Sequence, residues 1–243
     1  DKNVYGELYR VDENILKQVD ELEGFQEGGK QDDKSSEGFE RVEVTVHTHF
    51  GEFRADVYQY LEVPERSLPL ELGDWRCRQE LIEEVKYYYA FGSCMDDERF
   101  IKQGVEQLFQ DVVGCGVLNG YEMKFSLKSR KDGLGRADIV ETPGQVVEGK
   151  LYRIDREAID YLYVREGVYT GNYRPALVTV QCEGRSLSNV LTFIVINKQE
   201  EEVAPPEWYM EEILRGAKGC VSDEYYKRLL EKKQLLGLKT SDA

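Results

Sequence analysis

Hydrophobic and polar residues alternate in several short stretches of the chain, and this pattern predicts strands. The most strand-like stretch is Lys86–Phe91, which is rich in aromatic residues and contains neither Pro nor Gly. Similar patterns are found over residues 4–11, 42–46, 53–60, 111–118, 121–128, 173–182 and 191–197. Segments with helical spacing lie between these stretches, so we expect an α+β protein.

The first helical segment has recognisable signals at both of its ends. Asp12 is a suitable N-cap, apolar residues at 15, 16, 19 and 22 form one face, and Gly24 supplies a C-terminal stop. Glu23 is therefore expected at the exit of this helix. Further helices are predicted over residues 76–84, 96–109, 207–217 and 223–236, and after Asp155.

The segment 4–24 is repeated at 147–167 without a gap. The identical pairs are Val4/Val147, Gly6/Gly149, Leu8/Leu151, Tyr9/Tyr152, Arg10/Arg153, Asp12/Asp155, Glu23/Glu166 and Gly24/Gly167, and Val44–Val46 corresponds to Val178–Val180 further on. Strand packing accounts for Leu8, Tyr9 and their counterparts. It does not account for Glu23 and Glu166, because a carboxylate beside a helix C-terminus is electrostatically unfavourable. We therefore expect these two acids to have a role other than helix stability.

Composition and charge exclude several classes of function. The chain has 47 acidic and 32 basic residues, and its net charge of −15 argues against a nucleic-acid or anionic-membrane surface. Hydrophobic residues make up 41% of the chain, which is enough for a packed core. No apolar run approaches the roughly 20 residues of a membrane span, and no signal peptide is visible. We expect a cytoplasmic protein.

Cysteine and histidine residues give no metal motif. The five cysteines are scattered without a C-x-x-C pair, so reduced thiols are expected. His47 and His49 form an H-x-H pair without an accompanying Cys or carboxylate cluster, and a solvated strand face is the favoured interpretation. We expect neither a metal nor another cofactor.

The stretch from Tyr87 to Met95 is a candidate binding loop. A strand that leads through Gly92 and Ser93 into a helix directs backbone N–H groups at one point, where anions and carbonyl oxygens can bind. An ordinary turn at the end of a buried strand explains the same residues. On these residues alone, we favour the ordinary turn.

Further motifs in the same order resemble the γ-glutamylcyclotransferase domain over residues 87–236. They are Phe91-Gly92-Ser93-Cys94, Gly135-x-Ala137-Asp138-Ile139, Val147-x-Gly149-x-Leu151-Tyr152, Glu166-Gly167-Val168, Tyr173, Ala204-Pro205-Pro206, Tyr209, Gly216-Ala217 and Tyr225. Residues 1–75 resemble the second half of an AIG2-like domain of the same superfamily, through Leu22–Phe25 and Gly73–Trp75. The resemblance divides the chain into residues 1–78, a half domain with a linker, and residues 79–243, a complete domain.

The resemblance implies a small mixed β-barrel flanked by helices, present in duplicate, with a ligand cavity at the barrel mouth. It assigns Glu166 as the catalytic acid/base, with Glu23 as its counterpart in the first copy. The residues expected to bind a small-molecule γ-glutamyl substrate are Tyr88, Tyr89, Ala90, Phe91, Gly92, Ser93, Cys94, Tyr173 and Tyr209. The implied reaction is intramolecular aminolysis that releases 5-oxoproline, with no metal or redox cofactor and with no nucleic-acid or membrane partner. The oligomeric state stays open.

Two residues depart from the family pattern. Cys94 stands where an amide side chain is usual, and Phe91 lacks a hydroxyl group. A nucleophilic role for Cys94 is conceivable after a strand and before a helix, but a residue that only lines the pocket is favoured. Three functions therefore compete: a cyclotransferase, a metabolite-binding pseudoenzyme, and a nonenzymatic assembly protein.

Overall fold

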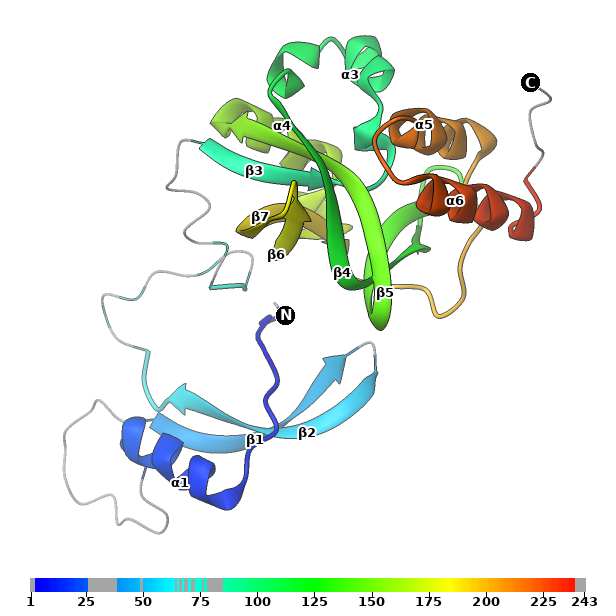
Figure 1. Ribbon diagram of the computed structural model, residues 1–243. Helices are drawn as coiled ribbons and strands as arrows, with labels where there is room; N and C mark the ends of the chain where they lie inside the picture. Colours follow the sequence, from blue (N-terminus) through cyan, green and yellow to red (C-terminus); the bar gives the residue numbers. More distant parts are fainter. Residues whose placement is uncertain are drawn as a thin grey trace. The chain divides into compact units, whose positions relative to one another are not determined.

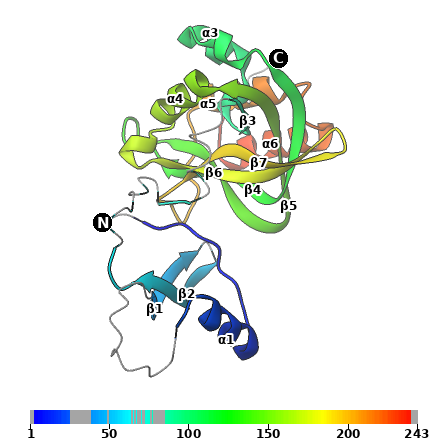
Figure 2. The same cartoon turned by 90° about the vertical axis from the view of Figure 1, so that its left-hand side faces the viewer.

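The structure is a computed structural model that describes residues 3–25, 39–48, 50–63, 65, 67, 70, 73–75, 77 and 85–238 (Figures 1 and 2). The chain divides into two compact units, Asp1–Trp75 and Arg76–Ala243. The boundary expected near Arg78 and the helix expected over residues 76–84 lie largely outside the described residues.

In the described residues of the first unit, we find one helix and one hairpin. Helix α1 (Glu13–Leu22) begins at Asp12, whose side chain accepts a 2.9 Å hydrogen bond from the backbone N–H of Ile15. Strands β1 (Phe39–Thr48) and β2 (Gly51–Tyr60) form an antiparallel two-stranded sheet. Residues 4–11 were expected to form a strand, and this is wrong: Tyr5 makes only an isolated bridge to Asp74.

The second unit is built on a closed five-stranded barrel in the order β3-β5-β4-β6-β7. The strands are β3 (Val85–Ala90), β4 (Val112–Lys128), β5 (Gly135–Asp155), β6 (Tyr173–Cys182) and β7 (Arg185–Val195). All neighbouring strands are antiparallel except β3 and β7, which are parallel. The predicted α+β class and small mixed barrel are confirmed.

The barrel is joined unevenly around its circumference. Strands β4 and β5 pair along most of their length, whereas β6 meets β4 at only two register pairs, Gly116 with Cys182 and Val117 with Gln181. The parallel contact between β3 and β7 has one register pair, Tyr88 with Leu191. The β6–β7 hairpin is therefore held to the rest of the barrel by short ladders.

Helices and 3-10 turns flank the barrel in the second unit (Figure 1). They are η1 (Ser93–Met95), α3 (Asp97–Gln103), η2 (Glu106–Phe109), α4 (Arg156–Arg165), η3 (Val168–Thr170), α5 (Glu207–Ala217) and α6 (Asp223–Leu235). The predicted helix over residues 96–109 is interrupted, because Gly104 adopts a left-handed conformation with φ of 67° and ends α3. The last predicted helix is found as α6 within one residue of its expected bounds, and the helix expected to open within Ala204–Tyr209 and to end at Gly216–Ala217 is found as α5.

The helical part of the sequence repeat is also a structural repeat, whereas residues 4–11 lack the strand that residues 147–154 form in β5. Helices α1 and α4 each have ten residues, and each is capped by an Asp side chain, from Asp12 and Asp155. Each helix ends at an acidic C-cap followed by a left-handed glycine. An antiparallel hairpin follows in both units, β1–β2 in the first and β6–β7 in the second.

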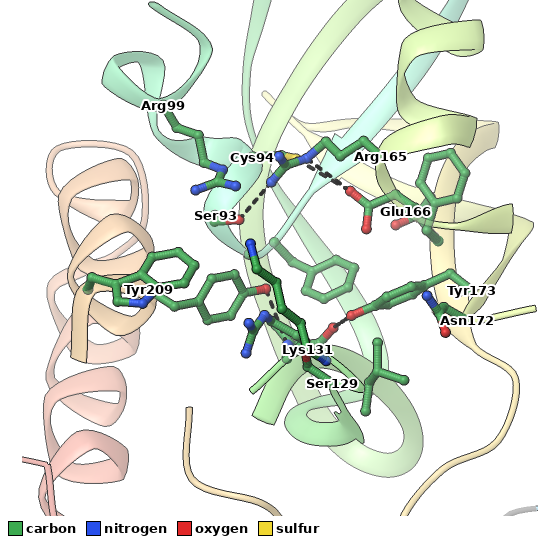
Figure 3. Close-up of a pocket in the computed structure, with 18 of the residues that line it drawn as sticks. Ser93, Cys94, Arg99, Ser129, Lys131, Arg165, Glu166, Asn172, Tyr173 and Tyr209 are labelled. Atoms are coloured by element: carbon green, nitrogen blue, oxygen red, sulfur yellow. Dashed lines mark hydrogen bonds and ion pairs between the residues drawn. The ribbon is translucent and has the colours of Figure 1, made fainter. Parts of the chain in front are cut away.

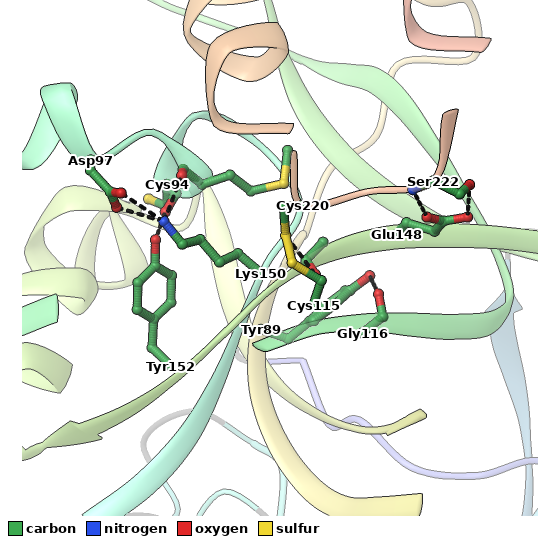
Figure 4. Close-up of a disulfide and its surroundings, with 12 residues drawn as sticks. Tyr89, Cys94, Asp97, Cys115, Gly116, Glu148, Lys150, Tyr152, Cys220 and Ser222 are labelled. Carbon is green, nitrogen blue, oxygen red and sulfur yellow. Dashed lines mark hydrogen bonds and ion pairs between the residues drawn. A yellow bond between two sulfur atoms is a disulfide. The ribbon is translucent and has the colours of Figure 1, made fainter. Parts of the chain in front are cut away.

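A disulfide joins Cys115 on β4 to Cys220, which follows α5 (Figure 4). The two residues are 105 positions apart in the sequence, and their Cα atoms are 5.5 Å apart. The expectation of five reduced thiols is therefore wrong for this pair. The fold of the second unit brings the two side chains together, and no local spacing of cysteines in the sequence indicates this pairing. Cys77, Cys94 and Cys182 are buried and do not take part in a disulfide.

Candidate active site

A pocket of about 360 Å³ opens in the second unit beside the turn after β3 (Figure 3). Segments distant in the sequence contribute to its walls: the β3–α3 loop, the β4–β5 turn, the exit of α4, strands β6 and β7, and the start of α5. The pocket is thus formed by segments that lie far apart in the sequence.

The loop after β3 forms one wall of this pocket. Ser93 and Cys94 are buried in the 3-10 turn η1, which begins at Gly92. A Cβ atom at Gly92 would lie 3.4 Å from the Cβ of Ala137 and 3.6 Å from the Tyr209 hydroxyl, which are ordinary van der Waals distances. The loop backbone thus lies close to Ala137 and Tyr209.

Glu166 faces this loop from the exit of α4. Its carboxylate Oε1 lies 3.7 Å from the Cys94 thiol and 3.3 Å from Nε of Arg165. Arg165 also donates hydrogen bonds to Ser93 Oγ at 3.0 Å and to Cys94 Sγ at 3.1 Å (Figure 3). One guanidinium therefore links the helix exit to the Gly-Ser loop.

Burial determines the protonation of these groups. Burial raises the pKa of Glu166 above the usual glutamate value, and the Arg165 charge opposes this shift. Burial also raises the pKa of Cys94, which favours the neutral thiol. Glu166 is thus a carboxyl group that exchanges a proton more readily at mild pH than an exposed glutamate, while Cys94 is a poor thiolate.

Two tyrosines hold the backbone of Ala137 on the pocket floor. The hydroxyl group of Tyr173 donates a 2.7 Å hydrogen bond to the carbonyl of Ala137, and that of Tyr209 accepts one of 3.3 Å from its N–H. Burial, with the nearby Glu166 charge, raises the pKa of Tyr209 to about 12. Both phenols are therefore protonated and fixed in direction.

Most of the predicted site residues line the pocket. They are Tyr88, Phe91, Gly92, Ser93, Cys94, Glu166, Tyr173 and Tyr209. Tyr89 and Ala90 are not among the lining residues, and their placement in the site needs correction. The Tyr89 hydroxyl instead donates a 2.8 Å hydrogen bond to the carbonyl of Val147. Successive strand residues point to opposite faces, so Tyr89 points away from the pocket that Tyr88 lines. Figure 4 shows Tyr89 beside Gly116 of β4.

Glu23 lies at the exit of α1, as predicted. It is half-buried, and its side chain makes no hydrogen bond or ion pair with the described residues of its unit. Leu22 precedes it where Arg165 precedes Glu166, so the first copy has no equivalent guanidinium. Its role in a second site stays a prediction.

Sequence reasoning missed the basic side chains of the pocket. Five cations line it: Arg99, Arg130, Lys131, Arg136 and Arg165. Three of them fall within residues 129–136, a dense basic stretch in an otherwise acidic chain. That local charge reversal was an available signal.

Groups that could bind a metal are absent from the part of the chain that is described: no three His, Cys, Asp or Glu side chains gather there. His47 is exposed and lies 3.1 Å from Glu52, while His49 lies outside the described residues. Within the same residues, no helix is long and apolar enough to cross a membrane. The cytoplasmic location stays a prediction.

Comparison with known proteins adds relatives in both units. Residues 146–229 match the AIG2-like family, and residues 1–77 match the family described as "Gamma-glutamyl cyclotransferase, AIG2-like". The Bacillus subtilis (strain 168) protein "Putative gamma-glutamylcyclotransferase YkqA" is 41% identical over 230 residues, which cover 93% of this chain and 76% of that protein. "Gamma-glutamylcyclotransferase" of Bos taurus is 29% identical over 147 residues, or 58% of this chain and 76% of that protein.

Solved structures agree with the fold. The crystal structure of YkqA from Bacillus subtilis matches with a TM-score of 0.80 and 38% identity, covering 98% of this chain and 80% of that one. A structure named "Gamma-glutamyl cyclotransferase" matches with a TM-score of 0.54 over 66% of this chain and 91% of its own. At 23% identity, the second likeness concerns the fold alone.

Proposed function

Since the chain belongs to the AIG2-like gamma-glutamylcyclotransferase family, we propose that its pocket binds a γ-glutamyl compound and cyclises the γ-glutamyl group to 5-oxoproline. The observation that supports this most directly is the position of Glu166. Its carboxylate shares a buried pocket with the Gly92–Cys94 loop, and its pKa is raised. A general acid/base works best when its pKa lies near the working pH.

In the proposed reaction, the α-amine of the substrate attacks its own γ-carbonyl carbon. A new C–N bond closes the five-membered ring, and the C–N bond to the leaving amine breaks. Glu166 takes the proton lost by the attacking nitrogen and delivers it to the departing nitrogen, so protons balance. Both reacting groups belong to one molecule, and a pocket that holds the folded conformer can draw on effective molarities of about 10⁵–10⁸ M.

The loop and Arg165 have supporting roles in this proposal. In this proposal, the backbone N–H groups of the Gly92–Cys94 loop stabilise the developing oxyanion, for which one donor is worth about 3–4 kcal/mol. Arg165 positions the carboxylate, since it contacts Glu166, Cys94 and Ser93 together. We assign Cys94 a pocket-lining role and not that of a nucleophile, because its raised pKa leaves little thiolate.

Replacing Glu166 by glutamine tests the proposal. Glu166→Gln keeps the shape of the side chain but removes the proton acceptor, so 5-oxoproline release is expected to fall by roughly 10²–10⁴-fold. Glu157→Gln is the matched control, because Glu157 is an exposed acid on the first turn of the same helix. Release of 5-oxoproline from a panel of γ-glutamyl peptides and γ-glutamylamines is the measurement.

The same experiment separates the enzyme from a metabolite-binding pseudoenzyme. Ligand-induced stabilisation without product, equal in the wild-type protein and the Glu166→Gln variant, would favour the binding protein. Full activity of Glu166→Gln would remove this residue from the mechanism.

A further inference from the structure

The pocket carries positive charge that its own acids do not balance. Arg165 pairs with Glu166, Arg99 with Glu212 at 2.7 Å, and Arg136 with Asp132 at 2.7 Å. The remaining two lining cations, Arg130 and Lys131, have no hydrogen-bond or ion-pair partner for their side chains among the described residues. Two cations thus stay uncompensated in a chain whose net charge is −15.

The turn that carries Arg130 and Lys131 is held in place by its backbone. Ser129 N–H bonds to the Leu134 carbonyl at 2.9 Å, and Gly133 N–H bonds to the Ser129 carbonyl at 2.8 Å. The Ser129 hydroxyl accepts a 3.2 Å hydrogen bond from the N–H of Lys131. The backbone that carries these two pocket-lining cations is therefore ordered.

The acid within this turn is already engaged. Asp132 accepts hydrogen bonds from Arg136 and from the N–H of Leu134 at 3.1 Å. The Asp132 carboxylate is thus engaged by Arg136 and Leu134 and not by Arg130 or Lys131. Neutralisation of Arg130 and Lys131 is left to solvent ions or to a bound molecule.

The turn lies across the pocket from the proposed reaction centre. Figure 3 shows Arg165, Glu166 and Cys94 along one side, with the Lys131 side chain running into the pocket from the turn opposite. A substrate with its reacting atoms at Glu166 that extends across the pocket would reach Arg130 and Lys131.

We propose that the leaving group is an acidic amino acid, with its α-carboxylate and a second carboxylate opposite Arg130 and Lys131, which are the specificity-determining residues. This inference rests on the proposed function. Counted within the leaving group alone, an acidic amino acid presents two carboxylates to the two uncompensated cations, a neutral amino acid presents one, and a simple amine presents none. Guanidinium and ammonium groups both form charge-assisted hydrogen bonds with carboxylates.

Two isosteric substrates test the inference directly. γ-Glutamyl-glutamate and γ-glutamyl-glutamine differ in one charge at nearly constant shape, and kcat/KM for 5-oxoproline release is compared for the two. The wild-type protein is expected to prefer the glutamate compound, and Arg130→Gln and Lys131→Gln are each expected to reduce that preference by roughly three- to tenfold. Lys128→Gln is the matched control, because Lys128 is an exposed cation at the end of β4 that does not line the pocket.

A binding measurement keeps this test separate from the test of the reaction. In the Glu166→Gln variant, the Kd values of the two compounds should show the same preference, and the Arg130→Gln/Lys131→Gln double substitution should abolish it. Turnover of both compounds without preference would overturn the inference but leave the proposed function standing. A binding preference without product would overturn the reaction but leave the acidic ligand standing. Failure to bind either compound would overturn both.

Discussion

At the scale of single residues, burial and a neighbouring charge act on Glu166 in opposite directions. Removing the carboxylate from water raises its pKa, while the Arg165 guanidinium at 3.3 Å lowers it, and burial has the larger effect. An exposed glutamate would stay ionised down to its ordinary pKa of about 4.3. Glu166 gains protons at a higher pH than that.

This balance predicts the pH dependence of the reaction. A base must be ionised, so kcat/KM is expected to fall on the acid side as the pH drops through the raised pKa of Glu166, above the ordinary glutamate range. Arg165→Gln removes the opposing charge and should move this fall in kcat/KM to still higher pH. The pH profile of 5-oxoproline release measures both effects. The assignment of Glu166 as the base would be contradicted if kcat/KM fell only at or below the ordinary glutamate pKa. It would also be contradicted if Arg165→Gln did not shift the fall.

The sequence indicated the site residues that belong to motifs. The repeat singled out Glu166, the family resemblance implied that Glu166 and the Gly-Ser loop belong to one site, and both line one pocket. Tyr89 was misplaced because strand alternation decides which of two adjacent tyrosines faces the pocket. The pairing of Arg165 with Ser93 and Cys94 spans more than 70 positions, and no local pattern reports a contact of that kind.

At the scale of elements, the position of the helix that ends at Glu166 depends on the residue that caps its N-terminus. Asp155 caps α4 by accepting a 3.0 Å hydrogen bond from the N–H of Ala158, and Asp12 does the same for α1. Ten-residue helices are too short to be stable alone. Capping and packing therefore decide where the α4 exit lies.

The two caps provide a matched pair of substitutions. Asp155→Ala is expected to lower the free energy of unfolding by about 1 kcal/mol and to reduce turnover, because the α4 exit carries Arg165 and Glu166. Asp12→Ala removes the equivalent cap from α1 and should cost a similar amount without reducing turnover. Chemical denaturation and 5-oxoproline release measure the two effects. An equal loss of turnover in both variants would contradict a site confined to the second unit.

Element type was predicted more accurately than element length. The β6 strand was predicted with the bounds that the structure has, and the bounds of α5 and α6 were nearly as close. Strands predicted over 111–118 and 121–128 are one strand, because β4 continues through a register shift at Asn119–Tyr121 rather than turning. A glycine in a strand pattern reads as a turn or as an irregularity, and only the partner strand distinguishes them.

At the scale of the whole molecule, the disulfide ties the chain across the second unit. It closes a loop of 105 residues that contains β5, α4, the β6–β7 hairpin and α5. Such a loop restricts the unfolded chain far more than the folded one. The stabilisation does not depend on local contacts, so sequence patterns could not indicate it.

Removing the disulfide is expected to destabilise the second unit. The chain-entropy account gives about 4–5 kcal/mol for a loop of this length, so the Cys115→Ser/Cys220→Ser variant should unfold at a clearly lower denaturant concentration. A reductant should lower the stability of the wild-type protein toward that of the variant and leave the variant unchanged. Equal stability of the two proteins in the absence of reductant would contradict the expected stabilisation.

The short ladders that hold the β6–β7 hairpin determine which amides exchange with solvent. Local opening follows the weakest connections of a structure, so the hairpin amides facing β3 and β4 should take up deuterium sooner than those between β4 and β5. Tyr173 and Phe193 extend from this hairpin into the pocket, opposite the loop of Ser93 and Cys94. A bound γ-glutamyl compound would contact both the hairpin and this loop, and it should slow deuterium uptake in the hairpin. Mass-spectrometric mapping of exchange can therefore report occupancy of the pocket even when no product forms.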